Sequence, residues 1–149
     1  MNKICCIIGQ ERMGFEKREA VFELAFEHIT KLVDEGYTDF ILESGQFRNL
    51  ARSVLTIIRM RNPKIKRVYF AKSDDNIAEL YDRKLYDEIY PFRENGIKKD
   101  TITHRHQAMI DKSDYCIFYV VNRAGELQNA MQYAKDKGKT LVNLASIKV

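Results

Sequence analysis

No apolar run in the sequence approaches the roughly 20 residues that a helix needs to cross a bilayer. The amino terminus, MNKICCIIGQERMG, is apolar over too short a stretch for a secretory signal and lacks the small residues of a cleavage site. These absences predict a cytoplasmic protein that does not enter a membrane. Repeats, linkers and low-complexity segments are also missing, so the 149 residues predict a single domain, residues 1–149.

Cysteine and histidine are scarce, and neither forms a metal-binding pattern. The three cysteines, Cys5, Cys6 and Cys116, contain no CxxC pair and stand within apolar, strand-like runs. This setting predicts buried structural thiols, because a free cysteine behaves as a small hydrophobe. His104 and His106 would point to different faces of a helix and make a poor metal pair. We expect no metal site and no resident cofactor.

The charge balance is modest for a chain of this length. The net charge is +4, with 45% hydrophobic and 31% charged residues, which describes an ordinary globular protein. Such a charge tolerates a phosphate-bearing ligand but does not by itself indicate nucleic acid. The densest basic run, Arg59–Arg67, has no interleaved aromatic residues for stacking bases, so it is interpreted as a solvated rim. We expect a small-molecule partner and no nucleic acid.

Strand and helix signals alternate along the whole chain. Apolar runs predict strands near residues 3–8, 38–43, 65–70, 115–121 and 140–145, and residues 86–96 are interpreted as an irregular connection. Apolar residues at helical spacing predict helices within residues 16–35, 47–58, 102–109 and 127–134, with a short one near Ile77. This order predicts a single-domain, Rossmann-like α/β fold, with a mainly parallel five-stranded sheet and helices on both faces.

The expected fold also predicts where a ligand binds. Ligands of such sheets lie beyond the carboxyl ends of the strands, where the strand order reverses. The candidate ligand-binding residues on these loops are Gly9, Gln10, Glu11, Arg12, Ser44, Gly45, Gln46, Arg48, Asn49, Asn122, Arg123 and Gly125. Gly45, just before a helix, could present backbone amides to an anion, and Arg48 could add charge. A turn with a helix cap explains the same Ser-Gly pair, and both interpretations stay open.

Four stretches of the sequence carry a family resemblance: CCIIGQERMGF, EGYTDFI, RHQAMIDKSDYCIFYV and AGELQNAMQYAKDKGKTLVNL. Together they resemble the SLOG superfamily, and within it the YpsA-like proteins, which are related to DNA-processing protein A and the LOG phosphoribohydrolases. The resemblance implies a Rossmann-like fold that binds a nucleotide or nucleotide derivative, which some branches hydrolyse. It also places Arg105 at the position of a family arginine that could reach a ligand phosphate. A surface ion pair with Asp111 or Asp114 explains Arg105 equally well.

Three loops differ from the YpsA-like pattern. Gly9-Gln10-Glu11 replaces Gly-His-Arg, Glu43, Phe47 and Asn49 replace two glycines and an aspartate, and Gly125-Glu126-Leu127 replaces Gly-Gly-Thr. Carboxylates therefore stand on three neighbouring loops, at Glu11, Glu43 and Glu126. They could form one reshaped pocket, or they could be unrelated acids in solvent.

Glu43 and Glu126 are the candidate catalytic residues. Glu43 ends a buried strand, where desolvation would favour the protonated form of a general acid. The first hypothesis is that the protein binds a nucleotide-like ligand without efficient catalysis. The second is an N-glycosidic hydrolase that acts on nucleoside monophosphates, and the third is a non-catalytic interaction protein with a vestigial pocket. A homo-oligomer stays open.

Overall fold

Parallel strands alternate with helices throughout the structure. The computed structural model describes residues 3–10, 15–43, 46–92, 99, 101–121 and 124–147, except for the side chains of Phe15 and Gln46. The strands are β1 (Lys3–Gly9), β2 (Tyr37–Leu42), β3 (Lys66–Phe70), β4 (Glu88–Tyr90), β5 (Tyr115–Tyr119) and β6 (Thr140–Asn143). They form one sheet in the order β4-β3-β2-β1-β5-β6, and every neighbouring pair is parallel. The predicted α/β class with a parallel sheet is confirmed.

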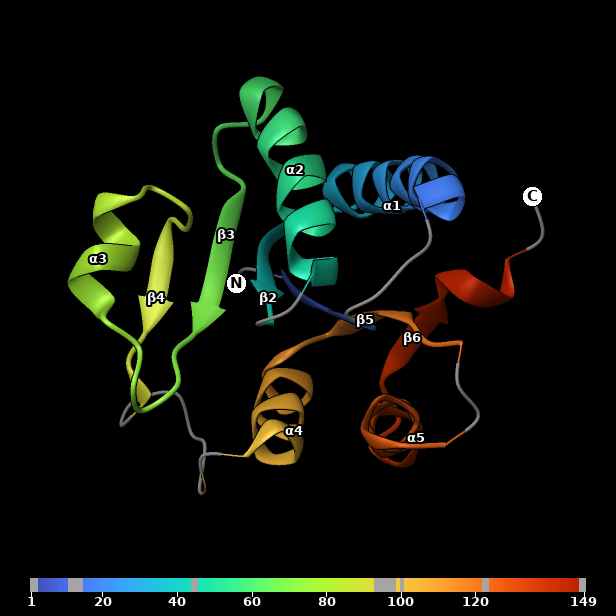
Figure 1. The fold of residues 1–149 in the computed structure, drawn as a ribbon. Helices are drawn as coiled ribbons and strands as arrows, with labels where there is room; N and C mark the ends of the chain where they lie inside the picture. The colour runs from blue at the N-terminus through green and yellow to red at the C-terminus, as the bar shows by residue number, and fades with distance from the viewer. Residues whose placement is uncertain are drawn as a thin grey trace.

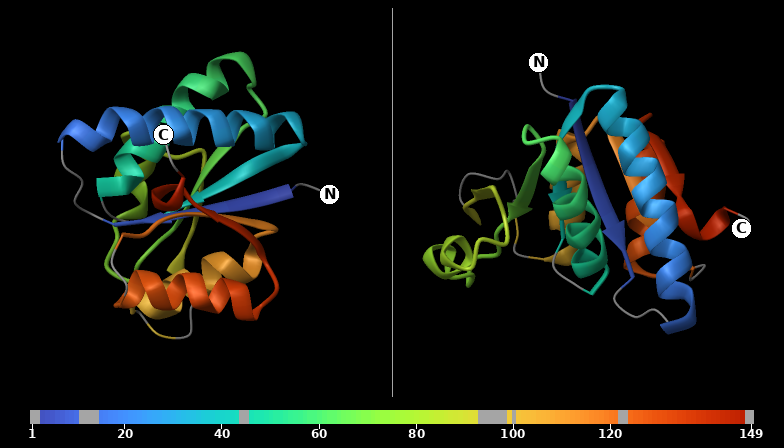
Figure 2. Two further views of the ribbon diagram at one scale, coloured as in Figure 1. Left: turned by 90° about the vertical axis from the view of Figure 1, so that its right-hand side faces the viewer. Right: turned by 90° about the horizontal axis from the view of Figure 1, so that it is seen from above.

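Helices cover both faces of this sheet (Figure 1, Figure 2). On one face lie α1 (Phe15–Asp34) and α2 (Gln46–Arg61), and on the other lie α4 (Ile102–Lys112) and α5 (Glu126–Asp136). A short helix, α3 (Ile77–Asp82), lies beside β4, and a 3-10 turn, η2 (Leu144–Ser146), follows β6. Each long helix buries an apolar stripe, as its sequence periodicity predicts. None of the described helices combines the length and apolar character that a membrane span requires.

The sheet has six strands, and the prediction of five strands was wrong. The additional strand is β4, within the segment that was interpreted as an irregular connection. Three residues are too few for a recognisable alternation of apolar and polar side chains. The strand is held by distant contacts instead, because the backbone N–H of Asp87 donates to the carbonyl of Arg67 at 2.8 Å. Such pairing cannot be read from the local sequence.

The carboxylate of Asp87 anchors β4 to β3 and α2. It accepts hydrogen bonds from the backbone N–H of Arg67 at 2.8 Å and from Nε and Nη2 of the same residue at 3.0 and 3.1 Å. Nη2 of Arg59 lies 3.0 Å from Oδ1 of the same carboxylate. The basic run was interpreted as a solvated rim, which describes the exposed Arg61 but not Arg67, whose side chain is only 11% exposed.

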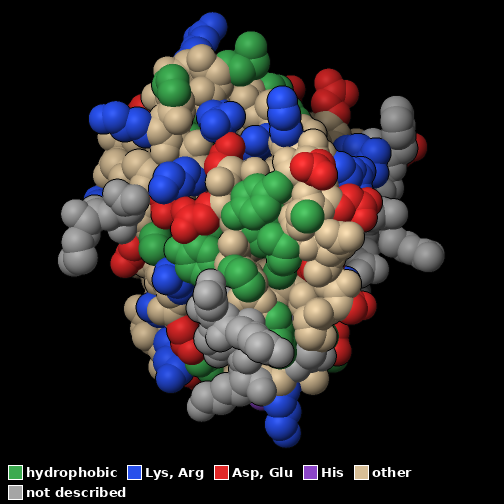
Figure 3. All heavy atoms as spheres, turned by 90° about the vertical axis from the view of Figure 1, so that its left-hand side faces the viewer, with side chains coloured by type: hydrophobic (Ala, Val, Ile, Leu, Met, Phe, Trp, Pro, Cys, Tyr) green, Lys and Arg blue, Asp and Glu red, His purple; other side chains and the backbone are tan. Residues whose placement is uncertain are grey.

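The short α3 helix satisfies a backbone group of this edge strand. The hydroxyl of Tyr81 accepts a hydrogen bond from the backbone N–H of Ile89 at 3.1 Å. Seen from this side, hydrophobic side chains gather over α3 and β4, with acidic and basic side chains around them (Figure 3). Covering a short edge strand in this way limits its pairing with another chain.

The cysteines lie where their apolar surroundings predict. Cys5 and Cys6 are in β1, Cys116 is in β5, and all three are buried free thiols. Burial raises the pKa of the Cys5 thiol well above its usual value. The prediction of buried structural thiols is therefore confirmed.

The order of the strands reverses between β1 and β5. From β1 the chain moves outward through β2 and β3 to β4, and then returns along α4, on the opposite face, to β5. The carboxyl ends of β1 and β5 therefore lie side by side, with Gly9 paired to Tyr119. In open parallel sheets this is the position where ligands bind.

We expect Asp87→Asn to lower the free energy of unfolding by about 2 kcal/mol near pH 7, because hydrogen bonds to a charged group are lost. Burial alone would raise the pKa of Asp87, but hydrogen bonds from Arg67 and the charges of Arg67 and Arg59 outweigh it and hold the pKa below 3.8. A lowered folded-state pKa stabilises the fold above the unfolded-state value, and this contribution is lost as the pH falls.

Urea denaturation of both proteins should therefore show a difference that is largest near pH 7 and narrows below pH 3.8. Asp82→Asn, at an exposed position of α3, is the matched control and should change stability little at either pH. A difference that stays constant with pH would contradict this account of Asp87.

Candidate functional site

Glu43 directly follows β2 and is buried, with 8% of its surface exposed. Alternate residues of a strand face opposite sides of a sheet. Phe40 and Leu42 contribute to the core beneath α1 and α2, whereas Ile41 belongs to the core against α4 and α5. Glu43 continues the second set, so its carboxylate points to the α4 side of the sheet.

Both oxygens of the Glu43 carboxylate have partners. Oε1 accepts a hydrogen bond from the backbone N–H of Gly9, at the end of β1, at 2.9 Å. Oε2 lies 2.6 Å from Nε2 of His106 on α4. A carboxylate that accepts such bonds forms strong, charge-assisted interactions. One side chain therefore joins the ends of β1 and β2 to a helix on the far side of the sheet.

His106 lies on the buried face of α4 and is 1% exposed. Its other ring nitrogen, Nδ1, is buried and has no hydrogen-bond partner in the described part of the chain. The ring borders a cavity of about 30 Å³ between α4 and α5, which is room for about one water molecule. Glu126 borders the same cavity from α5. Sequence reasoning considered His106 as a metal ligand and as a residue at helical spacing, and it missed the pairing with Glu43.

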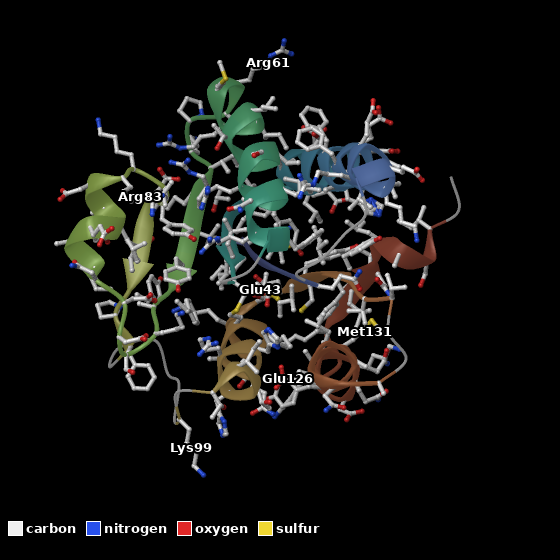
Figure 4. All side chains as sticks on the ribbon, in the orientation of Figure 1. Glu43, Arg61, Arg83, Lys99, Glu126 and Met131 are labelled. Carbon is white, nitrogen blue, oxygen red and sulfur yellow. The ribbon has the colours of Figure 1, made fainter. Side chains whose placement is uncertain are left out.

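The two candidate catalytic carboxylates do not face a common open crevice. Glu43 is hydrogen-bonded to His106, and Glu126, which is exposed, lies across the small cavity from the same histidine. Figure 4 shows Glu43 at the sheet and Glu126 below it, beside α5. His106 stands on the apolar stripe of α4 with Met109, three residues further on, and this spacing could have indicated that its ring is buried.

Gly9 is closed to an approaching phosphate by two side chains. The carboxylate of Glu43 accepts a hydrogen bond from the backbone N–H of Gly9, and the ring of Phe47 covers Gly9. A Cβ atom at Gly9 would lie 2.4 Å from Cδ1 of Phe47. The Phe47 ring also stacks on Tyr119, with centroids 5.6 Å apart and planes inclined by 12°. Glu43 and Phe47 occupy the positions at which the family resemblance implies glycines.

Gln10 joins β1 to β5 at the point where the strand order reverses. Its backbone N–H donates to the carbonyl of Tyr119 at 3.1 Å, and its Oε1 accepts from the backbone N–H of Val121 at 3.3 Å. The residue lies at the predicted edge of the sheet, and both contacts hold the two strand ends together.

The other described candidates lie in separate places. Asn49, on α2, accepts from Nη2 of Arg52 at 3.1 Å and borders a hollow between α1 and α2, whereas the charge of Arg48 acts on Tyr69 of β3. Arg105 is half-buried on α4, and Gly125 precedes α5 with φ of 107°, which glycine adopts without steric cost. Those of the predicted residues that the structure describes therefore do not converge on one pocket.

Several predicted residues fall outside the part of the chain that the structure describes. They are Glu11, Arg12, Ser44, Gly45, Asn122 and Arg123, together with the side chain of Gln46.

A groove of about 410 Å³ lies at the carboxyl end of β5, between α1 and the last turn of the described chain. Its walls are Lys17, Ala20, Val21 and Leu24 of α1, Tyr119–Val121, and Leu144–Ile147. This volume falls within the range of small-molecule sites. Sequence reasoning missed the groove because segments far apart in the chain form it.

No protein-family model matches the chain, and no curated protein matches it. The resemblance to the SLOG superfamily stays a prediction. Among the residues that the structure describes, no three histidine, cysteine or acidic side chains are grouped to hold a metal ion.

We expect Glu43→Ala to lower the free energy of unfolding by about 3 kcal/mol, because the Gly9 N–H and the His106 ring would lose their buried partner. Urea denaturation measures this difference. Glu126→Ala is the matched control on the other side of His106, and its exposed side chain should change stability by no more than about 0.5 kcal/mol. Equal effects of the two substitutions would show that Glu43 does not join these elements.

We expect Gly9→Ala to destabilise the fold by about 2 kcal/mol, because the new methyl group would overlap the Phe47 ring. Phe47→Leu removes part of this ring. In the double variant the total loss should be smaller than the sum of the two single losses by about 1 kcal/mol. Strictly additive losses in a urea-denaturation cycle would mean that Phe47 is not what excludes a side chain at Gly9.

Proposed function

We propose that the protein binds a nucleotide or nucleotide-derived small molecule at the carboxyl end of the sheet, without efficient catalysis. The groove between α1, the end of β5 and residues 144–147 carries this proposal. It adjoins the point where the strand order reverses, which is where parallel α/β sheets bind ligands.

The order of the strands supports a Rossmann-like assignment. Without β4, the order is β3-β2-β1-β5-β6, which corresponds to the order of the first five strands in dinucleotide-binding folds. The added strand extends the edge that is far from the groove. We propose that the chain forms one domain that is related to the SLOG superfamily and, within it, to the YpsA-like proteins. We also propose that the protein is cytoplasmic.

The lining of the groove suits a nucleoside with an acidic group. Its walls are mostly aliphatic, and Tyr119 adds an aromatic side chain next to the stacked Phe47. Lys17 supplies a positive charge at the amino-terminal part of α1. Apolar walls with a few polar groups are typical of small-molecule sites, because the walls bury the ligand and the polar groups orient it.

The position of Glu43 supports binding without catalysis. Hydrolysis of an N-glycosidic bond needs an acid or a nucleophile beside the anomeric carbon. The Glu43 carboxylate points to the α4 side of the sheet, whereas the groove is lined by α1 on the other side. Both of its oxygens are also occupied, so it could reach a ligand in the groove only by breaking two buried hydrogen bonds.

We expect a panel of nucleosides, nucleoside monophosphates and nucleotide sugars to include a ligand that raises the melting temperature. A ligand at 100 times its dissociation constant adds about 2.7 kcal/mol of stability. Ala20→Phe would fill the groove from α1 and should abolish the shift, whereas Ala78→Phe, at an exposed position of α3, should leave it unchanged.

Lys17→Gln separates charge recognition from groove filling. The substitution should lower the affinity for a nucleoside monophosphate by about tenfold relative to the affinity for the corresponding nucleoside, because a charge-assisted contact is lost. A shift that survives Ala20→Phe would place the ligand elsewhere on the protein and refute the proposed groove.

A further inference from the structure

A row of polar side chains on α2 faces β3 and β4. Arg48, Arg52, Thr56 and Arg59 recur at intervals of three or four residues, which places them on one side of the helix. At the far end of this row, Arg59 binds Asp87, and Thr56 accepts a hydrogen bond from Nη1 of Arg67 at 3.3 Å. The cations at that end are therefore paired with a carboxylate.

The two arginines at the near end of the row have buried donors without acceptors. Nε of Arg48 and Nη1 of Arg52 are buried and have no hydrogen-bond partner among the described residues. Nη2 of Arg52 is bonded to the neutral Asn49 at 3.1 Å. In the described part of the chain, no ion pair joins an acidic side chain to either arginine.

A third polar group without a partner lies beside them. Tyr86 is only 4% exposed, and its hydroxyl is buried with no hydrogen-bond partner in the described residues. The guanidinium carbon of Arg52 lies 5.8 Å from the centre of the Tyr86 ring. The ring stacks in turn on Tyr69 of β3, at a centroid distance of 4.8 Å.

Arg48 belongs to the same cluster. Burial and a hydrogen bond to Asp75 raise the pKa of Tyr69 far above its usual value, and the charge of Arg48 opposes this increase. Asp75 is the nearby acid, but its Oδ2 already accepts from the hydroxyl of Tyr69 and the backbone N–H of Lys72, both at 2.7 Å. Arg48, Arg52, Tyr69 and Tyr86 therefore gather between α2 and the β3–β4 edge.

Unpaired buried polar groups are rare, because each loses its water without gaining a protein partner. Three of them lie in this cluster, two of them on cations, and none has an acceptor among the described residues. Asp87 supplies such an acceptor to Arg59 and Arg67 further along the same helix. Arg48 and Arg52 are partly exposed as residues, so the cluster borders the surface of the protein, while the donors that lack acceptors are themselves buried.

We infer that Arg48, Arg52 and Tyr86 bind an oxyanion, a phosphate or a carboxylate, carried by a small molecule. A guanidinium group suits this chemistry because its donors are fixed in a fork that matches two oxygens of the anion. The tyrosine hydroxyl adds a third donor. The site lies on the β3–β4 side of α2, whereas the groove of the proposed function lies beyond α1, so the two can be tested separately.

Calorimetric titration with inorganic phosphate, pyrophosphate and succinate, at constant ionic strength, tests this inference. We expect saturable binding of at least one of the three, and the preferred probe identifies a phosphate or a carboxylate as the ligand group. Arg48→Gln and Arg52→Gln should each lower the affinity for the preferred probe by at least about tenfold. Arg61→Gln is the matched control, because Arg61 is exposed at the other end of α2 (Figure 4) and should bind as the original protein does.

Tyr86→Phe distinguishes a binding role from a structural one. Without ligand, it removes a buried hydroxyl that has no partner, so stability to urea should stay equal or increase. Affinity for the same probe should fall by about tenfold. Absence of saturable binding by all three probes would overturn the inference, as would equal weakening by Arg61→Gln or unchanged affinity in both Arg48→Gln and Arg52→Gln. The groove variant Ala20→Phe should bind the probe normally, whether or not the proposed function holds.

Discussion

The buried carboxylate of Glu43 is the interaction on which the architecture of the sheet edge depends. A parallel sheet leaves backbone N–H groups unpaired where its strands end, and these groups attract anions. Here the acceptor is part of the chain, because Glu43 accepts a hydrogen bond from the N–H of Gly9 and is hydrogen-bonded to His106 of α4. The amide of Gly9 is therefore satisfied internally, and a ligand must find its binding energy at another part of the edge.

That constraint explains why the polar residues expected at one crevice, as far as the structure describes them, are distributed over several places. Once Gly9 is occupied and Phe47 covers it, the space at the end of β1 is filled. The open volume lies farther along the edge, beside β5 and α1. On the other side of α2 lie Arg48 and Arg52, each with a buried donor that has no partner among the described residues. The two sides differ in character, since the groove is largely apolar and the arginine cluster is polar.

Much of the fold could be predicted from the sequence, because its signals are local. Cys5 to Ile8 form an unbroken apolar run, which is typical of a strand buried on both faces, and the helices follow an apolar period. The strand β4 could not be predicted, because its position depends on Asp87 meeting arginines about twenty or more residues away in the chain.

The candidate site was harder to predict than the fold, and for a similar reason. The position of Glu43 at the end of a strand was correct, and the alternation from Phe40 to Leu42 already determines the face to which it points. Its partner could not be identified without knowing that α4 crosses beneath the sheet. The pairing of Arg52 with Tyr86 likewise depends on how α2 lies over β3, which no single stretch of sequence encodes.

The joint blocking of Gly9 also bears on how this loop could change over evolution. A glycine in place of Phe47 would open the space, but the carboxylate of Glu43 would still hold the amide of Gly9. A glycine in place of Glu43 would free the amide, but the ring would still cover it, and His106 would be left buried without its partner. Each single step yields no phosphate site and one of them costs stability. A lineage with both side chains in place would therefore stay there, since either single change leads to a form with nothing for selection to favour.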